Sequence, residues 1–279
     1  MKKFIAAFDG LEFSQATMDY ALSLAGQCDA HLVGVFLEDR TYHSYQFSEL
    51  VNQEGGVSDE KMLQLNKQDK EVRDRSVDLF EAACRKAGMN YTVHRDRNVA
   101  LQELLHESIY ADLVLIDSKE AFNRYEESMP TQFMKDLLAD VKCPVLIVPG
   151  IFAPIESVVL LYDGEPTSVH AIKMFSYLTP GLKEIKAEVL SVKKEKQSLH
   201  LPDHALMKEF MKRHYPSANY LVEKGDTEEH IISHLKGASS GTLVVLGAYQ
   251  RGRVSRWFKA SMADFLMRYA KVPLFIAHN

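Results

Sequence analysis

The stretch Ile5-Ala6-Ala7-Phe8-Asp9-Gly10 is an apolar run that ends in Asp-Gly, and Val159-Leu160-Leu161-Tyr162-Asp163-Gly164 repeats it 154 residues further along the chain. A short apolar run that stops at a turn signal is typical of a strand buried on both faces of a parallel sheet. Two such copies in one chain indicate an internal duplication. The duplication decides the fold before any single motif does.

A second pair of segments repeats in the same order. Residues 112–117 are followed by 142–148, and residues 242–247 are followed by 271–277; each pair is an apolar strand pattern and then Lys-x-Pro leading into another apolar strand. Segments of helical periodicity lie between the strand patterns, which favours a parallel sheet with right-handed crossovers. We therefore expect an α/β protein with two tandem five-stranded, mostly parallel sheets flanked by helices, in domains 1–150 and 151–279.

The expected strands occupy matching places in the two halves. They are residues 4–8, 31–37, 91–94, 113–116 and 145–148 in the first half, and 158–162, 189–192, 220–222, 243–246 and 274–276 in the second. The first half is longer, and the surplus falls in residues 40–59, which we interpret as an extra loop. Residues 151–156 form the predicted linker.

Charge separates the two halves more clearly than composition does. Residues 1–150 carry 16 basic and 25 acidic side chains (net −9), and residues 151–279 carry 17 and 13 (net +4). An anionic ligand is therefore expected to prefer the second half. Neither half is basic enough to predict nucleic acid as a partner, and no apolar stretch is long enough to predict a membrane span. The three cysteines follow no pattern, which favours reduced thiols and a cytoplasmic protein.

Asp9 and Asp163 each stand directly after a first strand. Ligands of open parallel sheets bind beyond the carboxyl ends of the strands, where a carboxylate can accept hydrogen bonds from a ribose or an adenine amino group. The alternative is a turn, because Asp-Gly is a common turn pair. The sequence leaves both interpretations open.

Residues 247–262 form a basic segment with two glycines, four cationic side chains and Ser261 at the start of the last predicted helix. A glycine lets backbone N–H groups approach an anion, and a helix that begins at a serine is a natural phosphate site. The alternative is an ordinary solvated loop before a capped helix. The matching segment of the first half, residues 117–132, has four carboxylates and no glycine, which disfavours a phosphate there.

With these residues each half resembles a universal stress protein domain, and the whole chain is similar to a tandem universal stress protein. The nucleotide-binding branch of that family has the pattern Gly, two residues, Gly, nine residues, Gly, Ser or Thr. In this chain the pattern falls on Gly247, Gln250, Ala260 and Ser261, of which the first and last match.

The resemblance implies a Rossmann-like fold of the adenine nucleotide alpha hydrolase type, with the last strands of the two halves, 145–148 and 274–276, paired across a pseudo-two-fold axis. It implies ATP or another adenine nucleotide in the second half and none in the first. The residues that it places around the nucleotide are Asp163, Val192, Gly247, Gln250, Arg251, Arg253, Ser261 and Met262.

No catalytic or metal motif accompanies this pattern. The chain has no Gly-x-Ser-x-Gly, no His-Glu-x-x-His and no P-loop, and the pairs His200/His204 and His230/His234 lack a visible third ligand for zinc. We therefore expect a non-enzymatic, cytoplasmic stress-response protein: an intramolecular pseudo-dimer, with a homodimer left open. Two alternatives remain at this point, an interaction scaffold without nucleotide and a weak ATPase.

Overall fold

The computed structural model describes residues 1–38, 43–45, 50, 58–96, 98–122, 127–195, 199–247 and 262–277. All ten expected strands are present. The elements of the first half are β1 (Lys2–Asp9), α1 (Gln15–Cys28), β2 (Ala30–Leu37), α3 (Asp59–Lys86), β3 (Tyr91–Asp96), α4 (Ala100–Ser108), β4 (Leu113–Asp117), α5 (Gln132–Asp140) and β5 (Val145–Val148). Those of the second half are β6 (Ser157–Leu161), α6 (Pro166–Leu178), the short 3-10 helix η1 (Pro180–Leu182), β7 (Lys186–Lys193), α7 (His204–His214), β8 (Asn219–Lys224), α8 (Thr227–Lys236), β9 (Thr242–Gly247), α9 (Met262–Tyr269) and β10 (Leu274–Ala277).

The strands form one ten-stranded sheet in the order β3-β2-β1-β4-β5-β10-β9-β6-β7-β8. The order is the same on both sides of the β5–β10 pair, as a duplication requires. Every pair is parallel except β5–β10, which is antiparallel. The α/β fold class with a mostly parallel sheet is therefore confirmed.

The β5–β10 pair joins the halves. Leu274 lies opposite Ile147, and Phe275 lies opposite Leu146; both strands are buried along their whole length. The expected pairing of the two last strands is confirmed. The expectation of two separate sheets is wrong, because hydrogen bonding between these strands makes the two five-stranded halves one continuous sheet.

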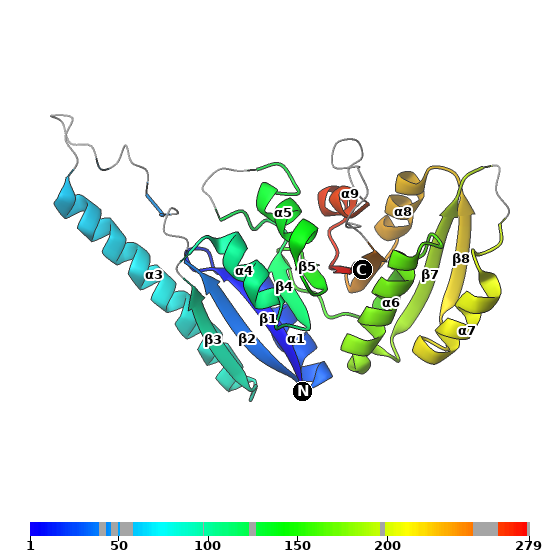
Figure 1. Cartoon of the computed structure of the whole chain (residues 1–279), viewed down its shortest axis with the longest axis horizontal. Coiled ribbons are helices and arrows are strands. Elements are labelled where there is room, and N and C mark those ends of the chain that lie inside the picture. Colours follow the sequence, from blue (N-terminus) through cyan, green and yellow to red (C-terminus); the bar gives the residue numbers. More distant parts are fainter. Residues whose placement is uncertain are drawn as a thin grey trace.

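Helices cover both faces of this sheet (Figure 1). Alternate residues of a strand point to opposite faces, so Phe4, Ala6 and Phe8 enter one core and Ile5 and Ala7 the other. The first core packs against α1, α3, α6 and α7, and the second against α4, α5, α8 and α9. Each core contains buried residues of both halves, so the halves share their hydrophobic interior.

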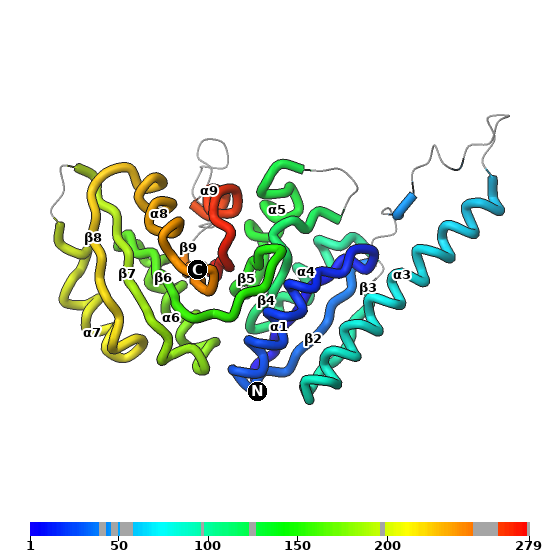
Figure 2. The backbone as a smooth tube through the Cα atoms, turned by 180° about the vertical axis from the view of Figure 1, so that it is seen from behind, coloured from blue at the N-terminus to red at the C-terminus, as the bar shows by residue number. Residues whose placement is uncertain are grey.

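The linker also packs between the halves. Figure 2 shows the chain passing from β5 to β6 beside α1, where the ring of Phe152 meets Tyr20 edge-on at 4.8 Å and the Ala153 N–H donates to the Tyr20 hydroxyl. Gly181 of η1 lies against the end of α1, and a Cβ added there would come within 2.2 Å of the Gln27 carbonyl oxygen. The division at residue 150 stays a prediction, since these contacts cross it.

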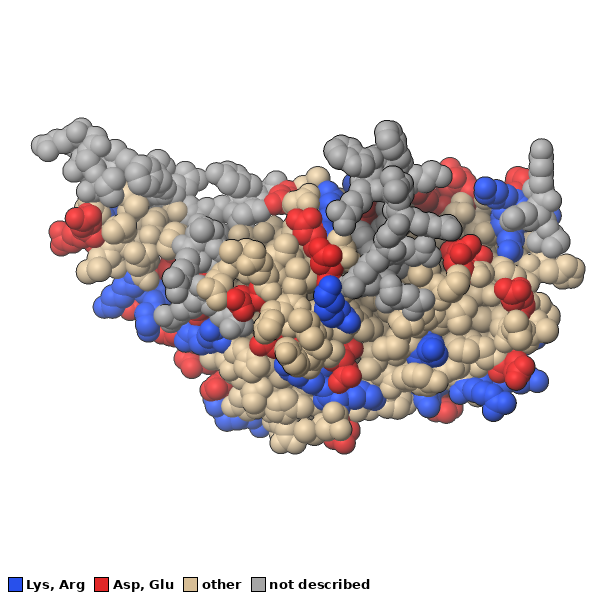
Figure 3. Space-filling model, viewed as in Figure 1, with Lys and Arg blue, Asp and Glu red and all other residues tan. Residues whose placement is uncertain are grey.

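Figure 3 shows basic and acidic side chains interspersed over one face of the described residues, without a continuous basic band. Among the described residues, no helix has both the length and the apolar character needed to cross a membrane. The expected extra loop at residues 40–59 falls mostly outside the described part of the chain.

We predict that the two halves unfold together. Phe275 is fully buried in β10 and meets the ring of Phe175 at 5.1 Å, so Phe275→Ala should lower the free energy of unfolding by about 3–5 kcal/mol. Denaturant unfolding followed by near-UV and far-UV circular dichroism should show one shifted transition in both signals, because buried tyrosines lie in both halves (Tyr20 and Tyr215). Tyr269→Ala, at an exposed position of α9, is the control and should change stability little. Two separate transitions would contradict a shared core.

Candidate functional site

Three predicted site residues lie at one edge of the sheet. Gly247 ends β9, Asp163 follows β6 and Val192 is the penultimate residue of β7. Strand β6 lies between β9 and β7, so these residues stand at the carboxyl ends of three neighbouring parallel strands. That edge is where ligands of open α/β sheets bind.

Asp163 forms a turn and remains exposed. Its Oδ1 accepts the N–H of Glu165 at 2.9 Å, and Gly164 has a φ of +93°, which favours glycine. The turn interpretation is therefore realised. The turn uses only Oδ1 of the carboxylate. The described residues supply no partner for Oδ2 of Asp163, so this oxygen can still accept a hydrogen bond.

Gly247 has a packing role that sequence analysis missed. A Cβ at this position would lie 2.5 Å from the carbonyl carbon and oxygen of Thr167 and 2.8 Å from the nitrogen of Ser168. The first turn of α6 therefore approaches the end of β9 as closely as a backbone can. This contact explains the glycine without any ligand, and a larger residue here would displace α6.

The remaining predicted residues divide into two groups. Met262 is the first residue of α9 and is partly buried against the core that Val192 also contacts. Gln250, Arg251, Arg253 and Ser261 lie outside the described residues, as do the other cations of the basic segment. The geometry at this edge therefore rests on Asp163, Val192, Gly247 and Met262.

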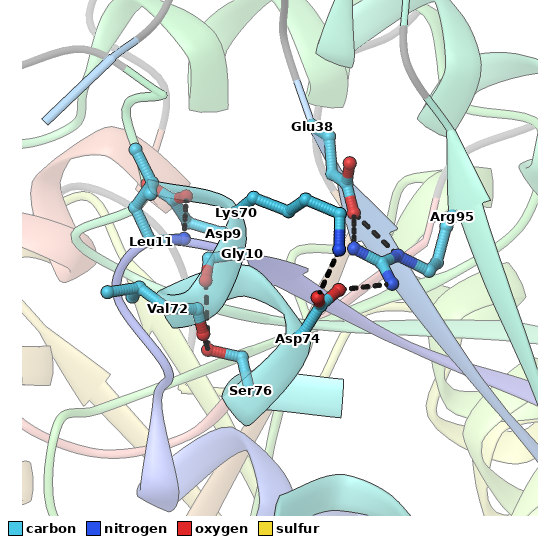
Figure 4. Close-up of polar contacts among 9 residues, drawn as sticks. All are labelled: Asp9, Gly10, Leu11, Glu38, Lys70, Val72, Asp74, Ser76 and Arg95. Atoms are coloured by element: carbon cyan, nitrogen blue, oxygen red, sulfur yellow. Dashed lines mark hydrogen bonds and ion pairs between the residues drawn. The ribbon is translucent and has the colours of Figure 1, made fainter. Parts of the chain in front are cut away.

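The first half uses the same backbone turn in a different environment. Asp9 accepts the Leu11 N–H through Oδ1 at 2.8 Å, as Asp163 does with Glu165. Asp9, however, is only 3% exposed. Figure 4 shows the turn at Asp9 beneath α3, where Ser76 donates to the Gly10 carbonyl at 2.8 Å. The equivalent carboxylate is thus open in one half and covered in the other.

A polar network ties α3 across the ends of β2 and β3 (Figure 4). Arg95 donates to the buried Glu38 at 2.6 Å and to Asp74 at 2.7 Å, and Lys70 reaches Asp74 at 2.7 Å. Lys70 and Arg95 hold the pKa of Asp74 below its usual range. The charged groups at this edge of the first half therefore bind one another.

Asp117 stands where the second half has Gly247. Its Oδ2 accepts the hydroxyl of Ser14 at 2.7 Å, and its Oδ1 accepts the Lys119 N–H at 3.0 Å. Ser14 is also the N-cap of α1. A carboxylate of the protein therefore occupies the start of α1, which is the region where a phosphate would profit from backbone N–H groups.

Glu120 adds a second unusual carboxyl to the first half. Burial raises its pKa well above the usual value, and the neighbouring carboxylates Asp9, Asp117 and Glu12 raise it further. Such a site disfavours any additional negative charge. Sequence analysis counted Glu120 as one of several acids in this segment, but spacing alone could not show which acid faces the others.

The predicted histidine pairs do not form a metal site. His230 bonds to Glu223 at 2.5 Å, and His234 bonds to Glu188 at 2.7 Å. Each ring therefore meets a carboxylate from a neighbouring strand, and the two rings do not converge. Within the described ranges no group of three His, Cys, Asp or Glu side chains could hold a metal ion.

The fold was compared with known proteins. No family model matches the chain, and no curated protein matches it either. A universal stress protein of Archaeoglobus fulgidus DSM 4304 superposes with a TM-score of 0.72 at 14% identity, covering 99% of this chain and 98% of that one. The chain has the fold of a tandem universal stress protein.

Two further structures agree with this result. A putative universal stress protein of Pseudomonas aeruginosa UCBPP-PA14 has a TM-score of 0.61 at 13% identity, covering 100% of this chain and 93% of that one. A functionally unknown protein, PA1789 of Pseudomonas aeruginosa PAO1, has the same TM-score and identity, with 92% of its own chain covered. All three structures align with 99–100% of this chain, so the similarity in fold extends through both halves.

Glu120 gives a test of the acidic edge. A carboxyl whose pKa is higher in the folded than in the unfolded protein loses stabilisation as pH rises above its unfolded pKa. Glu120→Gln removes this ionisation, so the melting temperature of the variant should exceed that of the wild type by a margin that grows from about pH 4.5 upward. Thermal melts between pH 4.5 and pH 8 measure the margin.

The exposed Glu184 supplies the matched control, because Glu184→Gln removes a carboxylate that faces solvent. The difference in melting temperature between Glu184→Gln and the wild type should stay nearly constant across the same pH range. A constant margin for Glu120→Gln as well would show that Glu120 is ionised without penalty.

Proposed function

We propose that this protein is a non-enzymatic, cytoplasmic stress-response protein that binds an adenine nucleotide in residues 151–279 and none in residues 1–150. The observation that carries the proposal is the contrast at one edge of the sheet. In the second half, Asp163 is exposed with one carboxylate oxygen available, and the neighbouring strand β9 ends in Gly247. In the first half, Asp9 is buried, and Asp117 stands at the position that corresponds to Gly247.

Each predicted residue has a role in this proposal. Asp163 accepts hydrogen bonds from the ribose or the base, and the backbone of Val192 contacts the adenine. Gly247 and Gln250 line the approach of the phosphates, Arg251 and Arg253 supply positive charge, and Ser261 with the N–H of Met262 holds a phosphate. The net charges of +4 and −9 favour the same half.

Binding without turnover is part of the proposal. Phosphoryl transfer needs a group that orients the attacking water and usually a metal held by a carboxylate. The motifs that supply these groups are missing from the sequence. A protein that uses nucleotide as a signal needs only the binding step, and protein partners rather than nucleic acid are expected to read its state.

The first prediction of this proposal uses a matched pair of variants. Asp163→Asn keeps the side-chain oxygen that accepts the Glu165 N–H but removes the charge. A hydrogen bond to a charged group contributes about 1.5–3 kcal/mol, so calorimetric titration with ATP should show at least about 10-fold weaker binding. Asp9→Asn makes the same change in the first half and should leave the affinity unchanged.

The outcomes of this titration separate the alternatives. Binding that weakens in Asp9→Asn but not in Asp163→Asn would place the nucleotide in the first half. Wild-type protein that binds neither ATP nor AMP would favour the interaction scaffold. Substitution of Gly247 is a poorer test, because a side chain there collides with α6 whether or not a ligand binds.

The second prediction concerns hydrolysis. Steady-state phosphate release from ATP should stay far below about 1 per second, the lower end of ordinary enzyme turnover. Ser261→Ala is the matched variant, since Ser261 is the predicted phosphate contact. A turnover number at or above that range in the wild type, lost in Ser261→Ala, would make the protein an ATPase instead.

A further inference from the structure

A groove of about 440 Å³ lies between α6 and α7 of the second half. It is on the sheet face opposite to the one that Val192 contacts, and its end at the carboxyl edge of the sheet lies beside Asp163. Its volume falls in the range of small-molecule sites. The lining residues are Tyr162, Gly164, Pro166, Val169, His170, Lys173, Asp203, Leu206, Met207 and Phe210.

The spacing of these residues shows how the groove runs. On α6 they recur at 166, 169, 170 and 173, and on α7 at 206, 207 and 210 after the N-cap residue 203, so each helix contributes one face. Both helices begin at the carboxyl edge of the sheet. The groove therefore follows two turns of both helices, which is about 10 Å at the rise of an α-helix.

The walls of the groove are largely apolar. Val169 and Phe210 are partly buried, Met207 is buried, and Leu206 is 69% exposed at the rim. An exposed leucine beside a concave apolar surface is unfavourable in water. A ligand with an apolar body would cover these side chains.

Charge is distributed unevenly along the groove. Asp203, together with Asp163, stands at the end near Tyr162, and burial and then these two carboxylates raise the pKa of Tyr162. Lys173 and His170 stand further along α6. Neither has a hydrogen-bond or ion-pair partner among the described residues, so a cation and a ring N–H remain to receive an anion away from Asp203.

The charged residues that line the groove favour a ligand with a single negative charge. Burial and the charge of Lys173 lower the pKa of His170, so at neutral pH its ring is mostly uncharged and can donate one N–H. Lys173 is then the one full positive charge among the lining residues. A monoanion such as a carboxylate matches it better than a doubly charged phosphate does.

The first half fills the corresponding space with its own side chains. Phe13 stacks on Phe8, the counterpart of Tyr162, at 4.9 Å, and Phe80 meets Phe8 at 5.7 Å. The Arg73 side chain lies over Gly10, where an added Cβ would come within 3.0 Å of Cγ. The open groove therefore belongs to the second half and does not follow from the fold itself.

We propose that the α6–α7 groove binds a small amphiphile with one unbranched apolar chain and one carboxylate. The chain lies against Val169, Leu206 and Phe210, and the carboxylate accepts hydrogen bonds from Lys173 and His170. These contacts differ from Val192, Gly247 and Met262, and the groove reaches Asp163 only at its end, through Tyr162 and Gly164.

Titration of the full-length protein with octanoate below its micelle concentration tests this proposal. Backbone ¹H–¹⁵N correlation spectra should shift saturably and most strongly in residues 166–173 and 203–210. Each buried methylene contributes about 0.8 kcal/mol, so hexanoate should bind about 10-fold more weakly than octanoate. Two further probes carry the same chain with a different head group: 1-octanol is uncharged, and octylamine is positively charged. Both should bind several-fold more weakly than octanoate.

Four exposed positions allow two variants and two controls that leave the core intact. Leu206→Glu removes an apolar contact and adds a like charge, so octanoate affinity should fall about 10-fold or more. Leu63→Glu, at a 74% exposed leucine of α3, should have no effect. Lys173→Gln should weaken octanoate about 2- to 5-fold but leave 1-octanol unchanged, and Lys183→Gln is its control.

Several results would overturn the proposal. Absence of saturable shifts, or equal affinity for octanoate, 1-octanol and octylamine, would exclude a carboxylate site. Unchanged octanoate binding in Leu206→Glu would locate the binding elsewhere. A wild-type dimer that Leu206→Glu converts to a monomer would show that a second copy of the chain covers the groove.

Discussion

The antiparallel pairing of β5 with β10 is the interaction on which the rest of the structure depends. Both strands are four residues long and buried, and without each other each half would expose an unpaired sheet edge to water. Their pairing turns two five-stranded sheets into one of ten strands. It also brings the helices of the two halves onto common faces, so the two hydrophobic cores run through both. The linker and η1 add further packing contacts between the halves, through the Tyr20–Phe152 ring contact and the close approach of Gly181 to α1. The two halves of the duplicated chain therefore share one sheet and both hydrophobic cores.

The two halves share this scaffold but differ in how far side chains cover the carboxyl edge of the sheet. The first half closes its edge with side chains of its own. Asp117 accepts the hydroxyl of Ser14, Glu38 and Asp74 share Arg95, and α3 lies over the turn at Asp9. The second half retains the Asp-Gly turn but leaves Asp163 exposed, and it lets α6 approach β9 over a glycine. On the other face it also leaves open a groove that aromatic side chains fill in the first half. The carboxyl edge is therefore covered by side chains in the first half and partly exposed in the second.

Much of this could be predicted from sequence because the signals are local. The apolar runs at 4–8 and 158–162 predicted buried strands, and helical periodicity predicted helices between the strands. Helix α6 begins at Pro166, since proline is favoured in the first turn of a helix. The prediction for the site was less complete. The family resemblance placed Asp163, Val192 and Gly247 around one ligand, and the strand order β9-β6-β7 brings them to one edge of the sheet. The packing of Gly247 against Thr167, the bond between Asp117 and Ser14, and the raised pKa of Glu120 join residues far apart in the chain. Spacing carries no information about such contacts.

The sequence by itself determined the duplication, the alternation of strands and helices, the charge contrast of −9 against +4, and the Asp-Gly turns. Each of these is a property of neighbouring residues or of composition, and neighbouring residues govern backbone preference and periodicity directly. Only the tertiary structure decided that the two sheets are one, that Asp9 is covered while Asp163 is exposed, and that the α6–α7 groove stays open. These features depend on which surfaces meet in space. Whether a given carboxylate is free or a given groove is filled is set by side chains that packing brings together from distant parts of the chain.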